Sequence, residues 1–288
     1  MDDRSKDELG AHVSTAGGLD KAPARAAALH VACLQCFTKQ PNRWREPTLD
    51  DTTIRRFRRE RLVHGIRVAG AHESYLINLA SPDPALRDRS VESFVAELRR
   101  CEALELDFLV THPGHATDGE LGEGVRRNGQ ALATALDAVD GRTRVLLELT
   151  AGGGSSVGGS FERLASILEH VPAGLRARLG VCLDTCHAYA AGYDLVDDYD
   201  GVWATFEKTL GWDRLGLLHV NDSRHPLGSH KDRHETLGDG TLGSAPFRRI
   251  MLDERLSRVP KILETPKGDD PVAADRANLS FLRVFRRD

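Results

Sequence analysis

Short apolar segments that end in a histidine or a carboxylate recur along this chain of 288 residues. The clearest of them is Leu179–Leu183, which runs directly into Asp184. A run of this length and composition is typical of a strand buried on both faces. Similar runs end at His112, Glu148 and His219, so the four ends are 36, 36 and 35 residues apart. This interval fits one strand followed by one helix, and it constrains the fold more than any other feature.

Eight such units can be traced along the chain. The expected strands end at His12, Phe37, His72, His112, Glu148, Asp184, His219 and Glu264. The amphipathic segments between and after them predict helices at Ala22–His30, Asp50–His64, Asp83–Leu104, Gly124–Val139, Ser160–His170, Tyr199–Leu210, Ala245–Arg255 and Ala273–Arg286. Alternating strands and helices predict an α/β fold with a parallel sheet, closed here as a single-domain (β/α)8 TIM barrel. We expect the barrel to occupy residues 9–288 and residues 1–8 to form a disordered tail.

Composition excludes several classes of protein. The net charge of −4 argues against a generally basic nucleic-acid coat, although a local basic face remains compatible with it. The polar start lacks the apolar core of a signal peptide, and no later segment has the roughly 18 apolar residues of a spanning helix. We therefore expect a cytoplasmic protein without membrane contact. Cys33 and Cys36 match C-x-x-C, but residues three apart on a strand point to opposite faces, so we expect no shared role.

Metal-capable side chains gather where the expected strands end. The carboxyl ends of barrel strands open on one face, and active sites are built there. Only the strand that ends at Phe37 lacks a histidine or carboxylate at its end. Each side chain alone could be an ordinary polar residue at a strand edge, and Asp184 and His187 could be the cap and a first-turn histidine of a following helix. Buried carboxylates in such number nevertheless need cationic partners. Asp232 and His234 have a spacing that points both the same way on an extended loop, and His187 could join them. Ligands of this mixed kind favour zinc over manganese or iron, and closely spaced metals suit the hydrolysis of phosphate esters.

The order of motifs along the chain points to a family. The motifs are GAHVSTAGGL, FTKQPNRW, HESYLINLA, THPGH, ELTAGGGSSVGGSFE, GVCLDTCHAYAAGYDL, LHVNDS, KDRHETLGDGTLG and ILET. From about residue 9 to 286 the chain resembles the endonuclease IV family of DNA repair enzymes, which act at apurinic/apyrimidinic sites. The resemblance implies a (β/α)8 barrel with three zinc ions. It also implies hydrolysis of the phosphodiester 5′ to an abasic site in double-stranded DNA, which leaves a 3′-hydroxyl and a 5′-deoxyribose phosphate, and removal of blocked 3′ ends. No obligate protein partner is implied.

The resemblance also assigns roles to residues. It implies one zinc held by His72, His112 and Glu148, a second held by Glu148, Asp184, His219 and Glu264, and a third held by His187, Asp232 and His234. Glu264, which would steer the attacking water, and Glu148 would be the catalytic carboxylates. The chain departs from the family at Leu149, where ELTAG replaces the usual ENTAG. We expect this change to remove a polar neighbour of Glu148 and to alter its surroundings.

Residues for DNA contact can be assigned in the same way. Tyr75 and Leu76 match the residues that fill the gap left when an abasic nucleotide leaves the stack. Arg43 and Arg233 would contact phosphates, and further candidates on the same loops are Lys39, Arg45, Arg224 and Lys231. The alternatives are core packing for Leu76 and, less so, for Tyr75, and solvated surface charge for each basic residue.

Two other functions compete with this one. Metal-dependent sugar isomerases and epimerases share the barrel style, but they need one or two metals and a catalytic lysine or paired acids over a small pocket. The nine candidate ligands and the long polar loops favour a phosphodiester instead. A catalytically silent, zinc-bound binder of damaged DNA is the second alternative, and Leu149 is the kind of change that could produce it. The presence of Glu148 and Glu264 argues against it.

Overall fold

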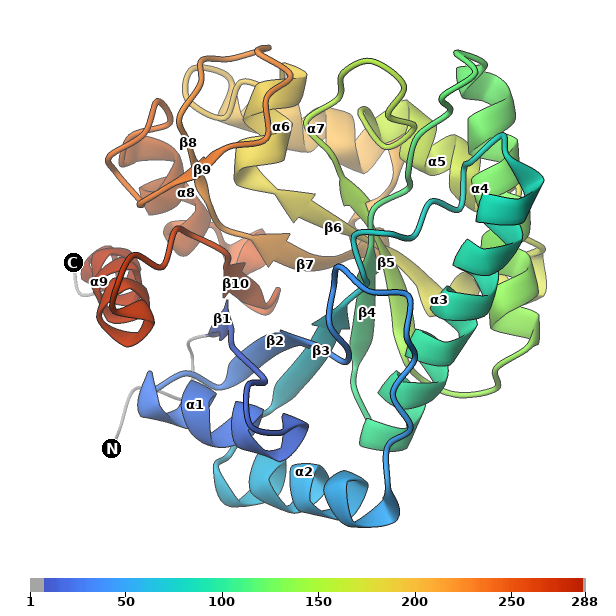
Figure 1. Ribbon diagram of the computed structural model, residues 1–288. Coiled ribbons are helices and arrows are strands. Elements are labelled where there is room, and N and C mark those ends of the chain that lie inside the picture. Colours follow the sequence, from blue (N-terminus) through green and yellow to red (C-terminus); the bar gives the residue numbers. More distant parts are fainter. Residues whose placement is uncertain (1–7, 287–288) are drawn as a thin grey trace.

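The computed structural model describes residues 8–286, and in it eight parallel strands close into a barrel (Figure 1). These strands are β1 (Leu9–His12), β2 (Cys33–Phe37), β3 (Val68–His72), β4 (Phe108–Thr111), β5 (Arg144–Leu149), β6 (Leu179–Asp184), β7 (Leu215–His219) and β10 (Lys261–Leu263). The barrel closes at β1, where Gly10 lies opposite Cys33 of β2 and Ile262 of β10. The predicted (β/α)8 fold is confirmed. Residues 1–7 of the expected tail lie outside the described residues, and the carbonyl of Glu8 accepts the Lys261 N–H at 2.7 Å.

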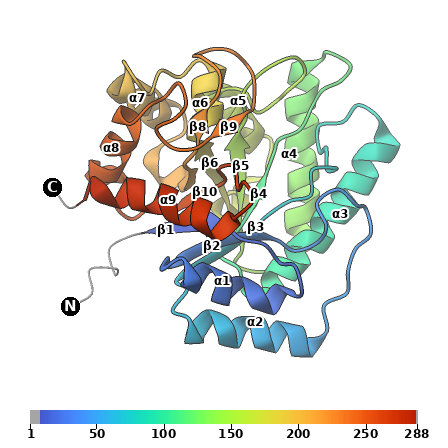
Figure 2. The ribbon, with the colours of Figure 1, turned by 60° about the vertical axis from the view of Figure 1, so that its left-hand side comes forward.

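Helices cover the outside of the barrel (Figures 1 and 2). They are α1 (Ala22–Ala28), α2 (Asp51–Val63), α3 (Pro84–Leu104), α4 (Leu121–Asp137), α5 (Phe161–Glu169), α6 (Thr185–Ala191), α7 (Tyr199–Thr209), α8 (Ala245–Leu252) and α9 (Pro271–Val284), with short 3-10 helices at Leu19–Lys21, Ala173–Arg178, Trp212–Arg214 and Glu254–Leu256. Side chains at the N-caps, such as those of Asp50 and Ser160, accept backbone N–H groups and define where helices begin. No helix in the described part of the chain has the length and hydropathy needed to cross a bilayer.

The apolar core has two layers. Inside the barrel, Phe108 packs where Gly70 leaves room, because a Cβ at Gly70 would lie 2.1 Å from the Phe108 ring. A larger layer lies between the barrel and its helices. Cys33 belongs to the inner layer and Cys36 to the outer one, so the two thiols diverge as predicted. Burial raises the pKa of Cys36 to about 12, which leaves its thiol protonated and inert.

Two short elements lie near the strand ends, of which the first is the helix that Asp184 was considered to cap and the second was not predicted. Helix α6 begins directly after β6, and a two-stranded antiparallel ribbon, β8 (Asp222–Ser223) with β9 (His234–Glu235), follows β7. The buried Asp222 carboxylate holds the loop that joins the ribbon to α8, accepting the backbone N–H groups of Gly238 at 2.9 Å, Gly240 at 3.1 Å and Leu242 at 3.0 Å. These short elements position the loop that carries Asp232 and His234.

Candidate metal centre

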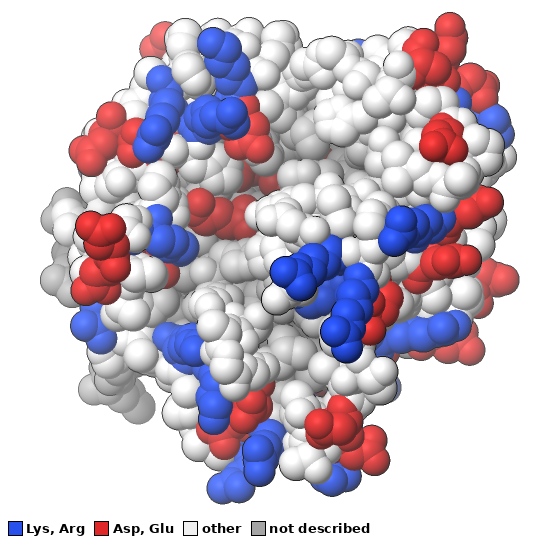
Figure 3. All heavy atoms as spheres, viewed as in Figure 1, with Lys and Arg blue, Asp and Glu red and all other residues white. Residues whose placement is uncertain are grey.

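A cavity of about 320 Å³ opens where the strands end, and seven of the nine predicted ligands line it. These are His72, His112, Glu148, His187, Asp232, His234 and Glu264. The other two, Asp184 and His219, are fully buried beneath its floor. Figure 3 shows this face hollowed at its centre, with Lys and Arg side chains interspersed with acidic ones around the hollow.

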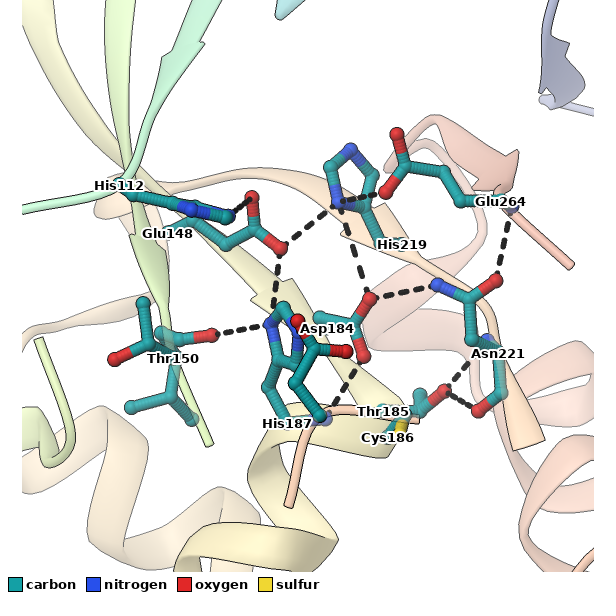
Figure 4. Close-up of polar contacts among 12 residues, drawn as sticks. His112, Glu148, Thr150, Asp184, Thr185, Cys186, His187, His219, Asn221 and Glu264 are labelled. Atoms are coloured by element: carbon teal, nitrogen blue, oxygen red, sulfur yellow. Dashed lines mark hydrogen bonds and ion pairs between the residues drawn. The ribbon is translucent and has the colours of Figure 1, made fainter. Parts of the chain in front are cut away.

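Glu148, near the end of β5, lies at the centre of the cluster (Figure 4). Its Oε2 is 3.2 Å from Nε2 of both His72 and His112, which stand at or just beyond the ends of β3 and β4. Its Oε1 is 3.1 Å from Nδ1 of both His187 and His219. A single buried carboxylate therefore contacts four imidazoles that come from four different strand ends.

The structure gathers the nine residues into the three groups that the resemblance implies. Within each group, one ligand atom from every residue lies within 4.8 Å of the ligand atoms of the others. The groups are His72, His112 and Glu148; Glu148, Asp184, His219 and Glu264; and His187, Asp232 and His234. Two further groupings include Cys182 or Cys186, but burial raises the pKa of both thiols, which makes them poor ligands. The oxygen and nitrogen groups are therefore the better candidates for a metal.

Hydrogen bonds on the outer side of the imidazoles fix which nitrogen faces the cluster. Backbone carbonyls, which can only accept, take the Nδ1 hydrogens of His72, His187 and His234 at 2.9 to 3.1 Å. In these rings Nε2 is therefore left to face the carboxylates, and in His187 Nδ1 also lies 3.1 Å from Glu148. The Nε2 atoms of His187 and His234 are buried and lie 3.2 and 3.4 Å from the Asp232 carboxylate. Imidazoles fixed in this way, with buried nitrogens aimed at carboxylates, fit a divalent cation of the zinc type.

Two neutral amides complete the centre, and both were missed from the sequence. Gln35 of β2 is fully buried, its Nε2 donates to Glu264 at 2.7 Å, and its Oε1 accepts from Nε2 of His219 at 2.9 Å. Asn221, just beyond β7, donates to Asp184 at 2.6 Å and accepts the Glu264 N–H at 2.9 Å (Figure 4). Strand β2, whose end lacks a histidine or carboxylate, thus contributes Gln35, two residues before its end. The inward-facing position of Gln35 on the strand is the signal that could have revealed its role.

Helix α6 explains how one residue serves both structure and site. Asp184 is the N-cap of this helix, and its Oδ1 accepts the His187 N–H at 2.9 Å, while its Oδ2 faces His219 and His234. The structural interpretation of this stretch, a cap and a first-turn histidine, and the metal-site interpretation are therefore compatible. The cap also fixes His187 against the third group.

In the absence of a cation, protons compensate the carboxylates. Burial alone would lower the pKa of His72, but Glu148 outweighs it and raises that pKa to about 9. Burial would likewise raise the pKa of Asp232, yet the hydrogen bond and charge of His187 lower it to about 2. The pKa of Glu264 falls below its usual range because His219 and His12 outweigh its burial. The centre therefore favours ionised carboxylates that face positive charge.

The expected effect of Leu149 is wrong in its physical basis. Its side chain is fully buried in the apolar layer between the barrel and the helices, and only its carbonyl, which accepts from His187, faces the site. Since Leu149 follows Glu148 on a strand, its side chain points to the opposite face. The Leu149 side chain therefore faces away from the Glu148 carboxylate.

The residues expected to contact DNA fall into two groups. Tyr75 is 59% exposed and lines the cavity, Leu76 is half-buried, and Arg43 and Arg233 are exposed on two different loops, the first between β2 and α2 and the second between β8 and β9. The prediction for Lys39 is wrong, because its Nζ is buried and donates to Glu46 at 2.6 Å and to Ser93 at 2.8 Å.

Comparisons with known proteins agree with this geometry. The family described as xylose isomerase-like TIM barrel matches residues 23–284. Proteins named Probable endonuclease 4 are similar over almost the whole chain: that of Geobacter sulfurreducens is 46% identical over 285 residues, covering 98% of this chain and 95% of its own length, and that of Chloroflexus aggregans is 42% identical over 282 residues, covering 97% and 98%. The crystal structure of endonuclease IV from Thermus thermophilus has a TM-score of 0.87 at 36% identity and covers 97% of this chain and 98% of its own. A D-tagatose 3-epimerase-like protein, with a TM-score of 0.71 at 15% identity over 96% and 98% of the two chains, shares the fold. The chain belongs to the endonuclease IV family of xylose isomerase-like TIM barrels.

Proposed function

We propose that this chain is a zinc-dependent endonuclease that hydrolyses the phosphodiester 5′ to abasic sites in double-stranded DNA. The products would be a 3′-hydroxyl and a 5′-deoxyribose phosphate, and blocked 3′ ends would be further substrates. The observation that carries the proposal is the set of three ligand groups around Glu148, at the bottom of a cavity that the exposed Tyr75 also lines. All nine ligands come from one chain, so the centre needs no partner subunit. We place the reaction in the cytoplasm.

The donor set fits three zinc ions, one to each group. When bound, such ions supply a nucleophile at neutral pH and neutralise charge on the phosphate and the leaving oxygen. Their six positive charges would exceed the four negative charges of Glu148, Asp184, Asp232 and Glu264, so the centre would attract a phosphodiester.

Glu264 is the residue best placed to orient the attacking water. Its Oε1 accepts from Gln35 at 2.7 Å and is 3.0 Å from Nδ1 of His12, which fixes the carboxylate at the edge of the cavity. The lowered pKa of Glu264 keeps it an acceptor for the water's hydrogen. Glu148 holds the surrounding imidazoles in place through its four contacts.

Recognition of the abasic nucleotide would fall to the rim of the cavity. The Tyr75 ring lies edge-on to Phe37, with centroids 5.4 Å apart, and its exposed face is free to stack on a base. Leu76 would enter the gap beside it. Arg43 and Arg233, exposed on loops from either side, would contact backbone phosphates and orient the duplex.

The test is incision of a duplex that carries one tetrahydrofuran abasic analogue. The zinc-loaded protein should cut 5′ to the analogue, and both prolonged chelation and Glu264→Gln should abolish the cut. Zinc re-addition should restore activity to the chelated protein only. Tight binding without incision would identify a silent binder, and a protein that neither binds nor cuts would direct attention to sugar substrates.

A further inference from the structure

The buried Lys39 belongs to a polar network that the proposed chemistry does not use. We define the α3 charge cluster as Thr38, Lys39, Glu46, Ser93, Glu97 and Arg100. We infer that this cluster holds the two loops proposed to contact DNA in one fixed arrangement, with Glu97 as its positioning residue. The inference rests on the proposed function, because the DNA roles of Arg43, Tyr75 and Leu76 belong to that proposal.

One part of the cluster attaches the loop between β2 and α2 to helix α3. Glu46 Oε1, on the loop, accepts hydrogen bonds from Lys39 Nζ and Ser93 Oγ, both at 2.6 Å, and Glu46 Oε2 forms an ion pair with Arg100 Nη1 at 2.7 Å. Ser93 and Arg100 lie on α3, and Figure 1 shows the loop running beside this helix. The same loop carries Arg43 at its exposed side.

Glu97 connects the loop between β3 and α3, which carries Tyr75 and Leu76, to the loop between β2 and α2. Its Oε1 accepts the backbone N–H of Ser74 at 2.9 Å, and its Oε2 accepts from Thr38 at 3.3 Å. Next to these bonds, the Pro41 carbonyl accepts both Ser74 Oγ at 2.6 Å and the Tyr75 N–H at 3.1 Å. A single carboxylate on α3 is therefore bonded to the starts of both loops, one residue before Tyr75.

The chemistry of the cluster favours a positioning role over a purely stabilising one. The side chains of Lys39 and Glu97 are each 1% exposed and that of Arg100 is 7% exposed. Together with Glu46 they form a set of two basic and two acidic side chains that is largely removed from water. Apolar side chains of similar volume would often stabilise such a site as well or better. Charged hydrogen bonds, in contrast, fix the direction and distance of the groups that they join. None of these residues lines the cavity or belongs to a ligand group.

The test compares Glu97→Ala with a matched control, Glu102→Ala. Glu102 lies on the same helix and accepts two backbone N–H groups, those of Arg142 at 3.1 Å and Thr143 at 2.9 Å, beside Arg178, where Glu97 accepts one backbone N–H and one hydroxyl. It touches neither of the DNA-proposed loops through these bonds. If the role is merely structural, both variants lose stability, Glu97→Ala the more because its side chain is 1% exposed and that of Glu102 is 22% exposed. If Glu97→Ala does not fold, Glu97→Gln and Glu102→Gln replace the pair.

The first measurement needs no DNA. Trypsin cleavage after Arg43 and Arg45, followed by mass spectrometry on the zinc-loaded protein, reports how often the first loop opens. We expect Glu97→Ala to raise the rate of cleavage there by about tenfold, and Glu102→Ala to leave it unchanged. Equal rates in the two variants would overturn the inference, even if the proposed incision is confirmed.

The second measurement tests whether the two loops still engage DNA that contains the abasic analogue. For incision at the abasic analogue we expect Glu97→Ala to raise KM about tenfold and to change kcat by less than about threefold, because the lost contacts bind substrate and transition state alike. The fluorescence of 2-aminopurine opposite the analogue should show less unstacking, while hydrolysis of bis(p-nitrophenyl) phosphate stays the same. A KM equal to that of Glu102→Ala contradicts the inference. If the zinc-loaded wild-type protein does not incise the duplex, the proposed function is refuted instead.

Discussion

Gln35 shows how an uncharged residue can govern a metal centre. It occupies the barrel strand whose end lacks a histidine or carboxylate, and it joins the Glu264 carboxylate to the outer nitrogen of His219. Because its Oε1 accepts the Nε2 hydrogen, Nδ1 of His219 is left as the nitrogen that faces Glu148, Asp184 and Glu264. The amide therefore sets both the tautomer of one ligand and the rotamer of another.

Gln35→Ala should weaken zinc binding by about 10- to 100-fold, the usual effect of losing a residue that orients metal ligands. The affinity can be measured by competition with a chromogenic chelator. Gln130→Ala, at an exposed amide on α4, serves as the control and should bind zinc as the wild type does. Equal affinities in the two variants would show that Gln35 does not orient the ligands.

Protons held by the metal-free centre should be released when zinc binds. The pKa of His72, raised to about 9, and the raised pKa of His187, where Asp184 and Asp232 outweigh burial, keep both rings protonated near pH 7. Metal ligation requires their deprotonated forms, so the apparent affinity should increase as pH rises toward 9. Calorimetry of zinc binding at pH 7 in two buffers of different ionisation enthalpy measures the release. Identical heats in the two buffers would contradict this expectation.

The sequence predicted charged residues at the centre far better than neutral ones. Histidines and carboxylates at strand ends carry a chemical signal, and the structure brings all nine predicted ligands together. Gln35 and Asn221 carry no such signal, because their importance follows from partners that lie far away in the chain. Leu149 misled in the opposite direction, since proximity to Glu148 in sequence says little when successive side chains point to opposite faces.

At the scale of elements, the regular interval between strand ends predicted the barrel because a parallel strand must be followed by a crossover of similar length. The interval says nothing about the loops, and this is why the ribbon of β8 and β9 was missed and α6 was anticipated only as the helix that Asp184 could cap. Both are too short to show hydrophobic periodicity, and both depend on side chains that accept backbone N–H groups, namely Asp184 and Asp222.

Weakening the ribbon of β8 and β9 should release the zinc proposed for Asp232 and His234 and leave the other two bound. Asp222→Ala removes the acceptor of three N–H groups, of which the buried one of Leu242 typically costs about 1–3 kcal/mol when left unsatisfied, and the ribbon that holds Asp232 in its loop and His234 in β9 should loosen. We expect the variant to retain two zinc ions after dialysis where the wild type retains three. Atomic emission measures the content. Asp253→Ala, which removes the N-cap carboxylate of the 3-10 helix Glu254–Leu256, should keep all three, and a wild-type metal content in Asp222→Ala would refute the role of the ribbon.

Across the whole molecule, metal binding should make stability depend on pH in a characteristic way. In the metal-free protein the lowered pKa of Asp232, about 2, contributes stability above its ordinary value of 3.8, and that stability is lost as pH falls toward 2. The pKa of His72, raised from 6.5 to about 9, contributes stability below pH 6.5 that is lost as pH rises through 9. The metal-free protein should therefore be most stable between about pH 4 and 6.5.

Zinc acts in the opposite direction, because it needs the deprotonated imidazoles that the metal-free centre disfavours. Zinc at about a hundredfold above its Kd should stabilise the fold by about 3 kcal/mol, which corresponds to a rise in Tm of about 5–10 °C. The gap in Tm between the zinc-loaded and the chelated protein should widen from pH 6 to pH 9. Thermal denaturation monitored through the core residue Trp203, which stacks on Trp212 away from the cavity, measures it. A gap that narrows with rising pH would mean that protons on these histidines do not compete with the metal.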